Sequence, residues 1–185
     1  ALEATFDLQG DLAFDIKLSI RPGRMPDELA SFWGGYLVEF KLISNRRASE
    51  VGRDIAQMRR EAIRLGEGPK FTIDISRHEY VEHKEAHELD GYTIYVYSPA
   101  MIVCEKLRAI CQQMPAYAEV IKRKGLGNQR ARDFVDIEAV VRRFNVDLSS
   151  DRVKETVSAM FEAKHVPVSL IGQINTTKDF HALGF

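Results

Sequence analysis

Two predicted helices of this chain each carry an ionised residue on the side that should be buried. Apolar residues recur at helical spacing through residues 98–114, and Lys106 lies among them. In the segment 133–144, Asp133 lies one turn before Ile137 on the apolar side. An isolated charge is too costly to keep in a core, so each residue needs a counter-ion, a bound ion or a ligand. The spacing therefore predicts either a structural Lys106–Asp133 ion pair or a site where both residues serve a ligand.

Carboxylates on three predicted strands could meet on one face of a sheet. Each strand contributes one acid on its polar face: Asp15, Glu39 and Asp74. Carboxylates held close together repel one another unless a cation is present, and Mg²⁺ binds through one or two carboxylates together with substrate phosphates. The alternative is a solvated face on which lysines of neighbouring strands pair with these acids.

The tripeptide Glu39-Phe40-Lys41, downstream of Asp15, also fits the acid–x–Lys pattern of many metal-dependent nucleases. In those enzymes two acids hold the metal and the lysine helps to position an attacking water. Polar–apolar alternation in a strand produces the same pattern by chance. A nuclease site is therefore one hypothesis for these residues, and a solvated strand face is the other.

Basic residues and histidines give two further candidate sites. Five basic residues cluster within residues 122–132, and Arg108 lies on the preceding helix: Lys122, Arg123, Lys124, Arg130 and Arg132. Such a cluster can hold phosphates, or it can be a solvated loop. His83 and His87 are four residues apart, as zinc ligands on a helix can be. Because the segment around them is acidic and lacks an apolar stripe, we predict a solvated loop there.

The elements that position these residues change in character at Ser98. Alternation of apolar and polar residues predicts four strands: residues 11–20, 36–43, 71–76 and 92–97. Helical spacing predicts one helix from Ser44 or Asn45 to about Leu65, and the polar segment 77–90 reads as a connection.

After Ser98 the pattern is helical to the end of the chain. Ser98 is a good N-cap and Pro99 suits the first helical position, and a third helix is predicted at residues 149–163. We therefore expect an α+β fold with two domains, an α+β layer over residues 1–97 and a helical domain over residues 98–185, with a cleft where they join.

Composition sets broad limits on the function. The chain has 185 residues, 45% of them hydrophobic, and a net charge of −1, which gives no overall attraction to nucleic acid. Its apolar runs are far shorter than the roughly 20 residues needed to span a bilayer, and no leader peptide is expected. Cys104 and Cys111 are predicted to be reduced core residues, as is usual in the cytoplasm.

Three features of residues 71–165 follow one another in the order typical of one family. A strand with a single acid, Phe71-Thr-Ile-Asp74-Ile, comes first. A helix with Glu105-Lys106-Leu107-Arg108-Ala109-Ile110 follows, similar to an EKL-x-A-hydrophobic signature. Then comes Arg130-Ala-Arg132-Asp133-Phe-Val-Asp136-Ile, similar to an RD-x-x-D-hydrophobic signature. About half of the chain thus resembles the AbiEii-like nucleotidyltransferases, the toxin half of a bacterial type IV toxin–antitoxin and phage-defence system.

The resemblance implies a nucleotidyltransferase-like mixed sheet with packed helices, followed by a helical C-terminal domain. It implies a nucleoside triphosphate (NTP) donor, Mg²⁺ as cofactor, an RNA or protein acceptor and a cognate antitoxin. The residues to which it assigns catalysis are Asp74, Lys106 and Asp133. The residues that would bind the triphosphate are Lys106, Arg108, Arg132 and Asp136, and the metal ligands would be Asp15 and Asp74. Lys106 and Asp74 are then expected to face a common cavity.

The chain departs from the family pattern at the first motif. A Gly-Ser or Gly-Gly turn followed by Asp-x-Asp is not visible, and Asp7-Leu-Gln9 and Asp15-Ile-Lys17 each have only the first acid. Either the chain begins after this motif or part of the metal site is lost. A relative that binds a nucleotide or a partner without turnover is therefore a further hypothesis, beside the transferase and the nuclease.

Overall fold

The computed structural model describes residues 2–7, 9–66, 68–125 and 127–182. The chain is an α+β protein, as predicted, and divides into two units at residues 77 and 78. The sequence predicts the boundary twenty residues later, at Ser98, so the units differ from the predicted domains in the segment 78–97. Each unit is described below by itself.

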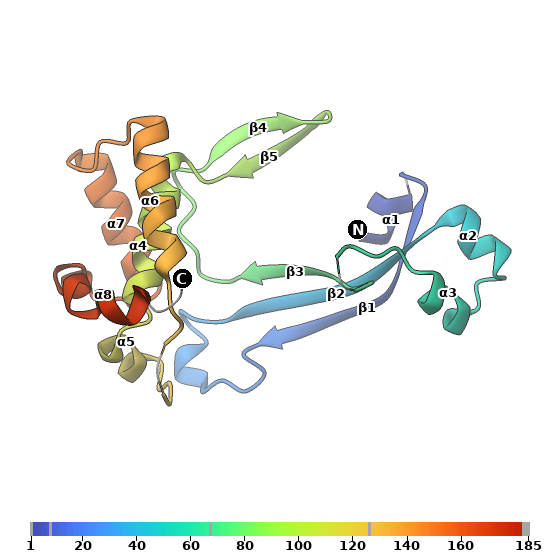
Figure 1. Cartoon of the computed structure of the whole chain (residues 1–185), viewed down its shortest axis with the longest axis horizontal. Helices are drawn as coiled ribbons and strands as arrows, with labels where there is room; N and C mark the ends of the chain where they lie inside the picture. Colours follow the sequence, from blue (N-terminus) through green and yellow to red (C-terminus); the bar gives the residue numbers. More distant parts are fainter. Residues whose placement is uncertain (1, 8, 67, 126, 183–185) are drawn as a thin grey trace. The chain divides into compact units, whose positions relative to one another are not determined.

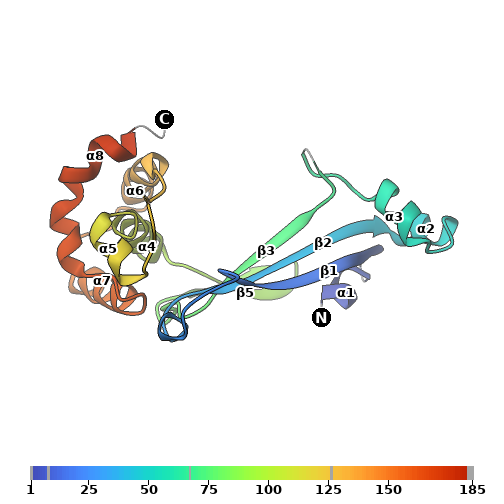
Figure 2. The ribbon, with the colours of Figure 1, turned by 90° about the horizontal axis from the view of Figure 1, so that it is seen from below.

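The first unit is built on a three-stranded antiparallel sheet. Its strands, in the order β1-β2-β3, are β1 (Asp11–Arg21), β2 (Gly35–Ser44) and β3 (Phe71–Ser76) (Figure 1, Figure 2). The first three predicted strands are thus neighbours in one sheet, which is the condition for their acids to meet. Lys17 lies opposite Glu39 in the register, and Leu37 lies opposite Asp74. Asp74 is opposite Leu37, and Leu37 and Glu39 are two residues apart on β2, so Glu39 and Asp74 lie on the same face of the sheet.

A bulge in β1 changes which side chains face the core. The register of β1 against β2 shifts between Phe14 and Lys17, and Asp15 has a left-handed backbone with φ +52°. Because a bulge inserts one extra residue, it reverses the alternation beyond it. The strict alternation from which the strand 11–20 is predicted would put Phe14 and Leu18 on one face, and this is wrong, since Phe14 is buried whereas Leu18 is 65% exposed.

Two helices replace the single helix predicted after β2. They are α2 (Asn45–Glu50) and α3 (Ile55–Glu61), separated by a turn in which Gly52 and Arg53 have positive φ. The Ser44 hydroxyl caps α2, as predicted, and the Asp54 carboxylate caps α3 by accepting from the Gln57 N–H at 2.8 Å. A competing N-cap inside the predicted helix therefore restarts it after one turn.

Small cores on both faces hold this sheet. On one face Phe14 and Ile43 pack with residues of the segment that holds α2 and α3, including Met58. On the other face Phe40 and Leu42 pack with Phe6 of α1 (Leu2–Asp7). A short 3₁₀ helix, η1 (Asp27–Leu29), interrupts the connection between β1 and β2.

The second unit begins with a hairpin that the sequence reading missed in part. The strands β4 (Glu85–Leu89) and β5 (Tyr92–Val96) form a separate two-stranded antiparallel sheet. They are joined by Asp90-Gly91, both with positive φ, which suits a tight hairpin turn. The predicted strand at residues 92–97 is confirmed, but the prediction of a loop around His87 is wrong, because pairing with β5 makes residues 85–89 a strand.

The rest of the second unit is helical, as predicted. Its helices are α4 (Pro99–Cys111), α5 (Pro115–Val120), α6 (Ala131–Phe144), α7 (Asp151–Glu162), η2 (Val168–Gln173) and α8 (Ile174–Ala182). The Ser98 hydroxyl caps α4 by accepting from the Met101 N–H. Helix α4 packs against both α6 and α7 (Figure 2). Met101 and Cys104 of α4 form a buried cluster with Met160 of α7. Over the described ranges, no helix is long and apolar enough to cross a membrane.

Candidate functional site

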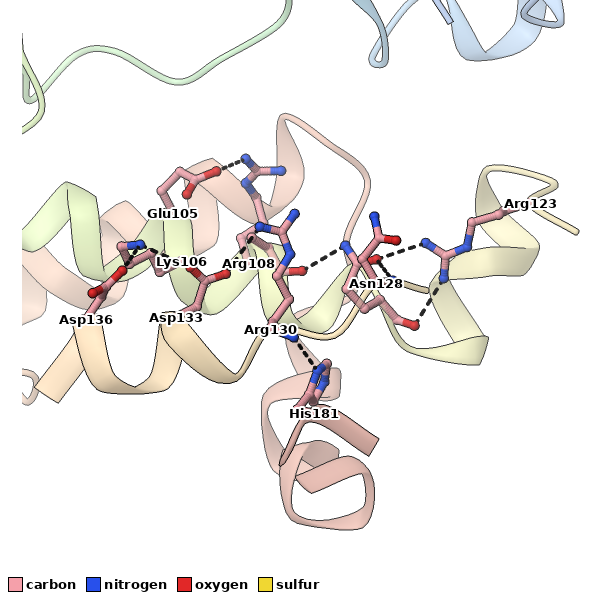
Figure 3. A network of polar contacts seen from close by, with 11 residues as sticks. Glu105, Lys106, Arg108, Arg123, Asn128, Arg130, Asp133, Asp136 and His181 are labelled. Atoms are coloured by element: carbon pink, nitrogen blue, oxygen red, sulfur yellow. Dashed lines mark hydrogen bonds and ion pairs between the residues drawn. The ribbon is translucent and has the colours of Figure 1, made fainter. Parts of the chain in front are cut away.

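The side chain of Lys106 connects α4 to α6 through two carboxylates. Its ammonium donates to Asp133 Oδ1 at 3.0 Å and to Asp136 Oδ2 at 2.7 Å (Figure 3). These hydrogen bonds, the one to Asp136 above all, raise the pKa of Lys106, so the ammonium stays protonated at neutral pH. The predicted Lys106–Asp133 pair is present, and Asp136 is a second partner that periodicity alone did not give.

The surroundings leave Lys106 partly accessible. Its side chain is 23% exposed, that of Asp133 12% and that of Asp136 52%. Arg130 lies 3.4 Å from the second oxygen of Asp133, so two cations and two carboxylates leave this cluster without net charge. An ammonium has three N–H donors, and the carboxylates take two of them. The third donor is the one that a ligand could use.

A second ionic network on α4 is more deeply buried. Arg108 lies 2.7 Å from Glu105 and 3.7 Å from Glu79, and Lys164 lies 2.8 Å from the other oxygen of Glu79. The Arg108 side chain is 6% exposed and that of Lys164 is 4% exposed. The sequence predicts a phosphate contact for Arg108, but the structure places its guanidinium between two carboxylates.

Glu79 and Lys164 are residues that the sequence reading missed. Lys164 follows Met160 by four positions and Phe161 by three, so it lies on the apolar side of α7's helical pattern. The reasoning that singled out Lys106 would have found it. Glu79 lies in the segment that connects β3 to β4. This segment has no periodic pattern from which the burial of a residue could be predicted.

The basic segment 122–132 does not act as one cluster. Arg123 donates from Nη1 to the Gln112 carbonyl and from Nη2 to the Gln113 carbonyl, both at 3.1 Å, so it binds the chain that follows α4 (Figure 3). Other members of the segment are exposed to solvent: Lys122, Lys124 and Arg132. Exposure leaves Lys124 and Arg132 accessible to a phosphate.

The predicted strand acids of the first unit lie in and near one groove. We call it the Asp15 groove; it has a volume of about 420 Å³ and these lining residues: Asp15, Ile16, Lys17, Glu39, Phe40, Lys41, Arg59 and Lys70. Asp15 accepts from Lys41 at 2.9 Å and from two nitrogens of Arg59 at 2.6 and 2.8 Å. Arg59, and then Lys41, lower the pKa of Asp15 from 3.8 to about 2.

Asp74 lies apart from this groove. Its side chain is 73% exposed and lies 4.0 Å from Arg21, and it does not line the groove that contains Asp15. Asp74 belongs to the first unit and Lys106 to the second. Within the described ranges, no group of three or more His, Cys, Asp or Glu side chains could hold a metal ion.

The histidines and cysteines take no part in a metal site of this kind. The His83 ring lies 2.9 Å from the Thr156 hydroxyl, whereas His87 is in β4 beside Glu85. Cys104 and Cys111 are free thiols, as predicted, and burial raises their pKa values to about 11 and about 12. Both cysteines are therefore core residues with little thiolate at neutral pH.

Comparison with known proteins decides the family. Residues 24–182 match the family described as "Nucleotidyl transferase AbiEii toxin, Type IV TA system". This chain belongs to the AbiEii nucleotidyltransferase toxin family. The resemblance carried by the signatures around Lys106 and Asp133 is confirmed, and a type IV toxin implies a cognate antitoxin. Neither the curated proteins nor the solved structures contain a match to this AbiEii chain.

Proposed function

We propose that this AbiEii chain binds an NTP through Lys106 and transfers its nucleotide to an RNA or protein acceptor. One observation carries the proposal. The Lys106 ammonium, inside a family signature, is held by two carboxylates of the second signature and is still 23% exposed. Because the carboxylates hold the ammonium in place and it is still partly exposed, Lys106 can contact a phosphate without leaving its partners.

The chemistry would be an in-line attack of the acceptor on the α-phosphate, with pyrophosphate as the leaving group. Charge develops on the leaving oxygens, and a cation fixed beforehand stabilises it without reorganisation. Asp133 and Asp136 fix the position of Lys106, and Arg132, exposed beside Asp133, adds a second positive charge. In this proposal Arg108 holds Glu105 and Glu79 in place and does not itself contact the triphosphate.

The Mg²⁺ that the family implies does not fit the described residues as a self-contained site. Both oxygens of Asp15 are bound by cations, and Asp74 is exposed and does not line the Asp15 groove. We propose that Mg²⁺ arrives with the triphosphate, because Mg²⁺ keeps several waters and binds largely through substrate phosphates.

We further propose that the protein acts in the bacterial cytoplasm and takes part in phage defence.

Calorimetric titration tests the role of Lys106. Each of the four common NTPs with Mg²⁺ is titrated into the wild-type chain, into Lys106→Ala, and into Lys154→Ala as a control. Lys154 is an exposed lysine of the same unit whose carboxylate partner, Asp151, is 91% exposed. Binding heat that is lost only in Lys106→Ala supports the proposal. Equal heats in all three proteins would remove Lys106 from the nucleotide site.

One observation keeps a nuclease as the second candidate. Asp15, Glu39 and Lys41 line the same groove, as the acid–x–Lys pattern predicts. The ion pairs of Asp15 with Arg59 and of Glu39 with Lys70 speak against it, because these cations occupy the oxygens that a metal would need. Nuclease activity that survives Glu39→Ala and Lys41→Ala would exclude this candidate.

A further inference from the structure

The Asp15 groove gathers four cations of the first unit. Residues 1–77 contain three lysines, and all three line this groove: Lys17, Lys41 and Lys70. Arg59 reaches the same hollow from α3. These four side chains come from two strands, a loop and a helix, so the alternation of a single strand does not bring them to one hollow. The convergence is therefore a property of the fold.

The carboxylates of the groove neutralise only part of this charge. Asp15 and Glu39 are the two acids among the lining residues, against four cations. Asp15 pairs with Lys41 and Arg59, and Glu39 pairs with Lys70 at 2.8 Å. Lys17 forms no ion pair within the described part of the chain and is exposed. The groove thus keeps two positive charges more than its acids balance.

The bulge in β1 places the carboxylate that holds two of these cations. Asp15 adopts a left-handed backbone at the bulge, which costs energy for a residue other than glycine. From there its carboxylate holds the Lys41 ammonium and the Arg59 guanidinium against the same pair of oxygens. Bulges that redirect a side chain are frequent beside functional sites. Asp15 therefore acts as the residue that organises two of the four cations.

We propose that the Asp15 groove binds phosphate oxyanions, either those of a nucleic-acid backbone or those of a free nucleotide. A hollow of a few hundred Å³ that is lined by four cations and two carboxylates, and so has two positive charges in excess, is suited to a phosphate ligand. Binding of a nucleic-acid backbone there would release condensed counter-ions. The groove volume of about 420 Å³ is within the usual range for ligand sites. This site belongs to the first unit, whereas the nucleotide site proposed at Lys106 belongs to the second.

Two binding measurements on the full chain test the groove and separate the two sources of phosphate. In the first, a labelled single-stranded RNA of about 12 nucleotides is titrated by fluorescence anisotropy at about 50 and about 200 mM salt. In the second, GTP without added metal is titrated by calorimetry. The variants are Lys17→Gln, which breaks no ion pair and should fold normally, and Arg59→Gln. The matched control is Arg60→Gln, the next residue on α3, which does not line the groove.

If the groove holds an RNA backbone, Lys17→Gln and Arg59→Gln each weaken RNA binding about threefold and lower the salt slope by about 0.7, while Arg60→Gln does neither. If the source is the free nucleotide, the same two variants weaken GTP binding and leave RNA binding as in the wild type. Wild-type affinity of Lys17→Gln for both ligands would overturn the proposal. Lys106→Ala, measured in parallel, tests the proposed transferase site, because Lys106 does not line the groove.

Discussion

The ammonium of Lys106 on α4 lies 3.0 Å from the carboxylate of Asp133 on α6. This pair joins the two family signatures of the chain across a helix interface, and Asp136 adds a second carboxylate one turn later. The geometry serves two purposes at once. It satisfies a largely buried carboxylate, and it fixes the direction of an ammonium that keeps one donor for a ligand.

Removal of one partner should cost more than removal of both. Lys106→Met leaves the Asp133 side chain, only 12% exposed, with Arg130 at 3.4 Å, so we expect the free energy of unfolding to fall by about 1.5–3 kcal/mol. The double variant Lys106→Met with Asp133→Leu leaves neither charge in the interface, and it should be within about 1 kcal/mol of the wild type. Urea denaturation followed by circular dichroism measures both.

Asp136→Ala is the control for this cycle. The Asp136 side chain is 52% exposed, so its loss should cost less than about 1 kcal/mol. A double variant as unstable as the sum of the two single variants would show that the Lys106–Asp133 pair is not a coupled unit.

Glu79 should matter more for stability than its place in a connecting segment indicates. Glu79→Ala removes the carboxylate 2.8 Å from Lys164 and 3.7 Å from Arg108, and both cations are almost fully buried. We expect a loss of about 3–5 kcal/mol in the free energy of unfolding, because a buried cation loses its counter-charge. Asp151→Ala, which removes a carboxylate that is 91% exposed, should cost less than about 1 kcal/mol. Similar losses in the two variants would contradict the structural role of Glu79.

The stabilisation that Asp15 provides should disappear in acid. Because its pKa is lowered from 3.8 to about 2 in the folded chain, its ion pairs contribute fully above about pH 4, and the contribution is lost as the pH falls toward 2. The stability difference between wild type and Asp15→Asn should therefore be constant from neutral pH to about pH 4 and shrink below it. Asn accepts the left-handed backbone of this position, so the variant tests the charge. A stability difference between the two proteins that grows as the pH falls would contradict a lowered pKa of Asp15 in the folded chain.

Local patterns in the sequence determined most of the elements of this protein. Ser98 and Pro99 start α4, and apolar alternation places β1, β2, β3 and β5. Such features depend on residues a few positions apart, whose backbone preferences and hydrogen bonds are local. The same is true of the signatures around Lys106 and Asp133, which led to the AbiEii family.

Where local signals competed, the tertiary structure decided. Asp54 is as good an N-cap as Ser44, so the predicted helix became two, and β4 formed because β5 offered a partner to a segment with little strand character of its own. The bulge at Asp15 reversed the facing of the rest of β1, since a single extra residue shifts a pattern of period two.

The partners of the buried charges were decided only in three dimensions. Periodicity indicated that Lys106 and Asp133 each needed a counter-charge, and it correctly paired them. Periodicity could not supply Glu79 as the partner of Lys164, because the two residues are 85 positions apart. It could not supply Arg59 as the partner of Asp15 either, because these residues are 44 positions apart and meet only when α3 packs near β1. The sequence determined which charges had to be satisfied, and the fold determined by which partners, because a counter-charge is chosen by proximity in space and not along the chain.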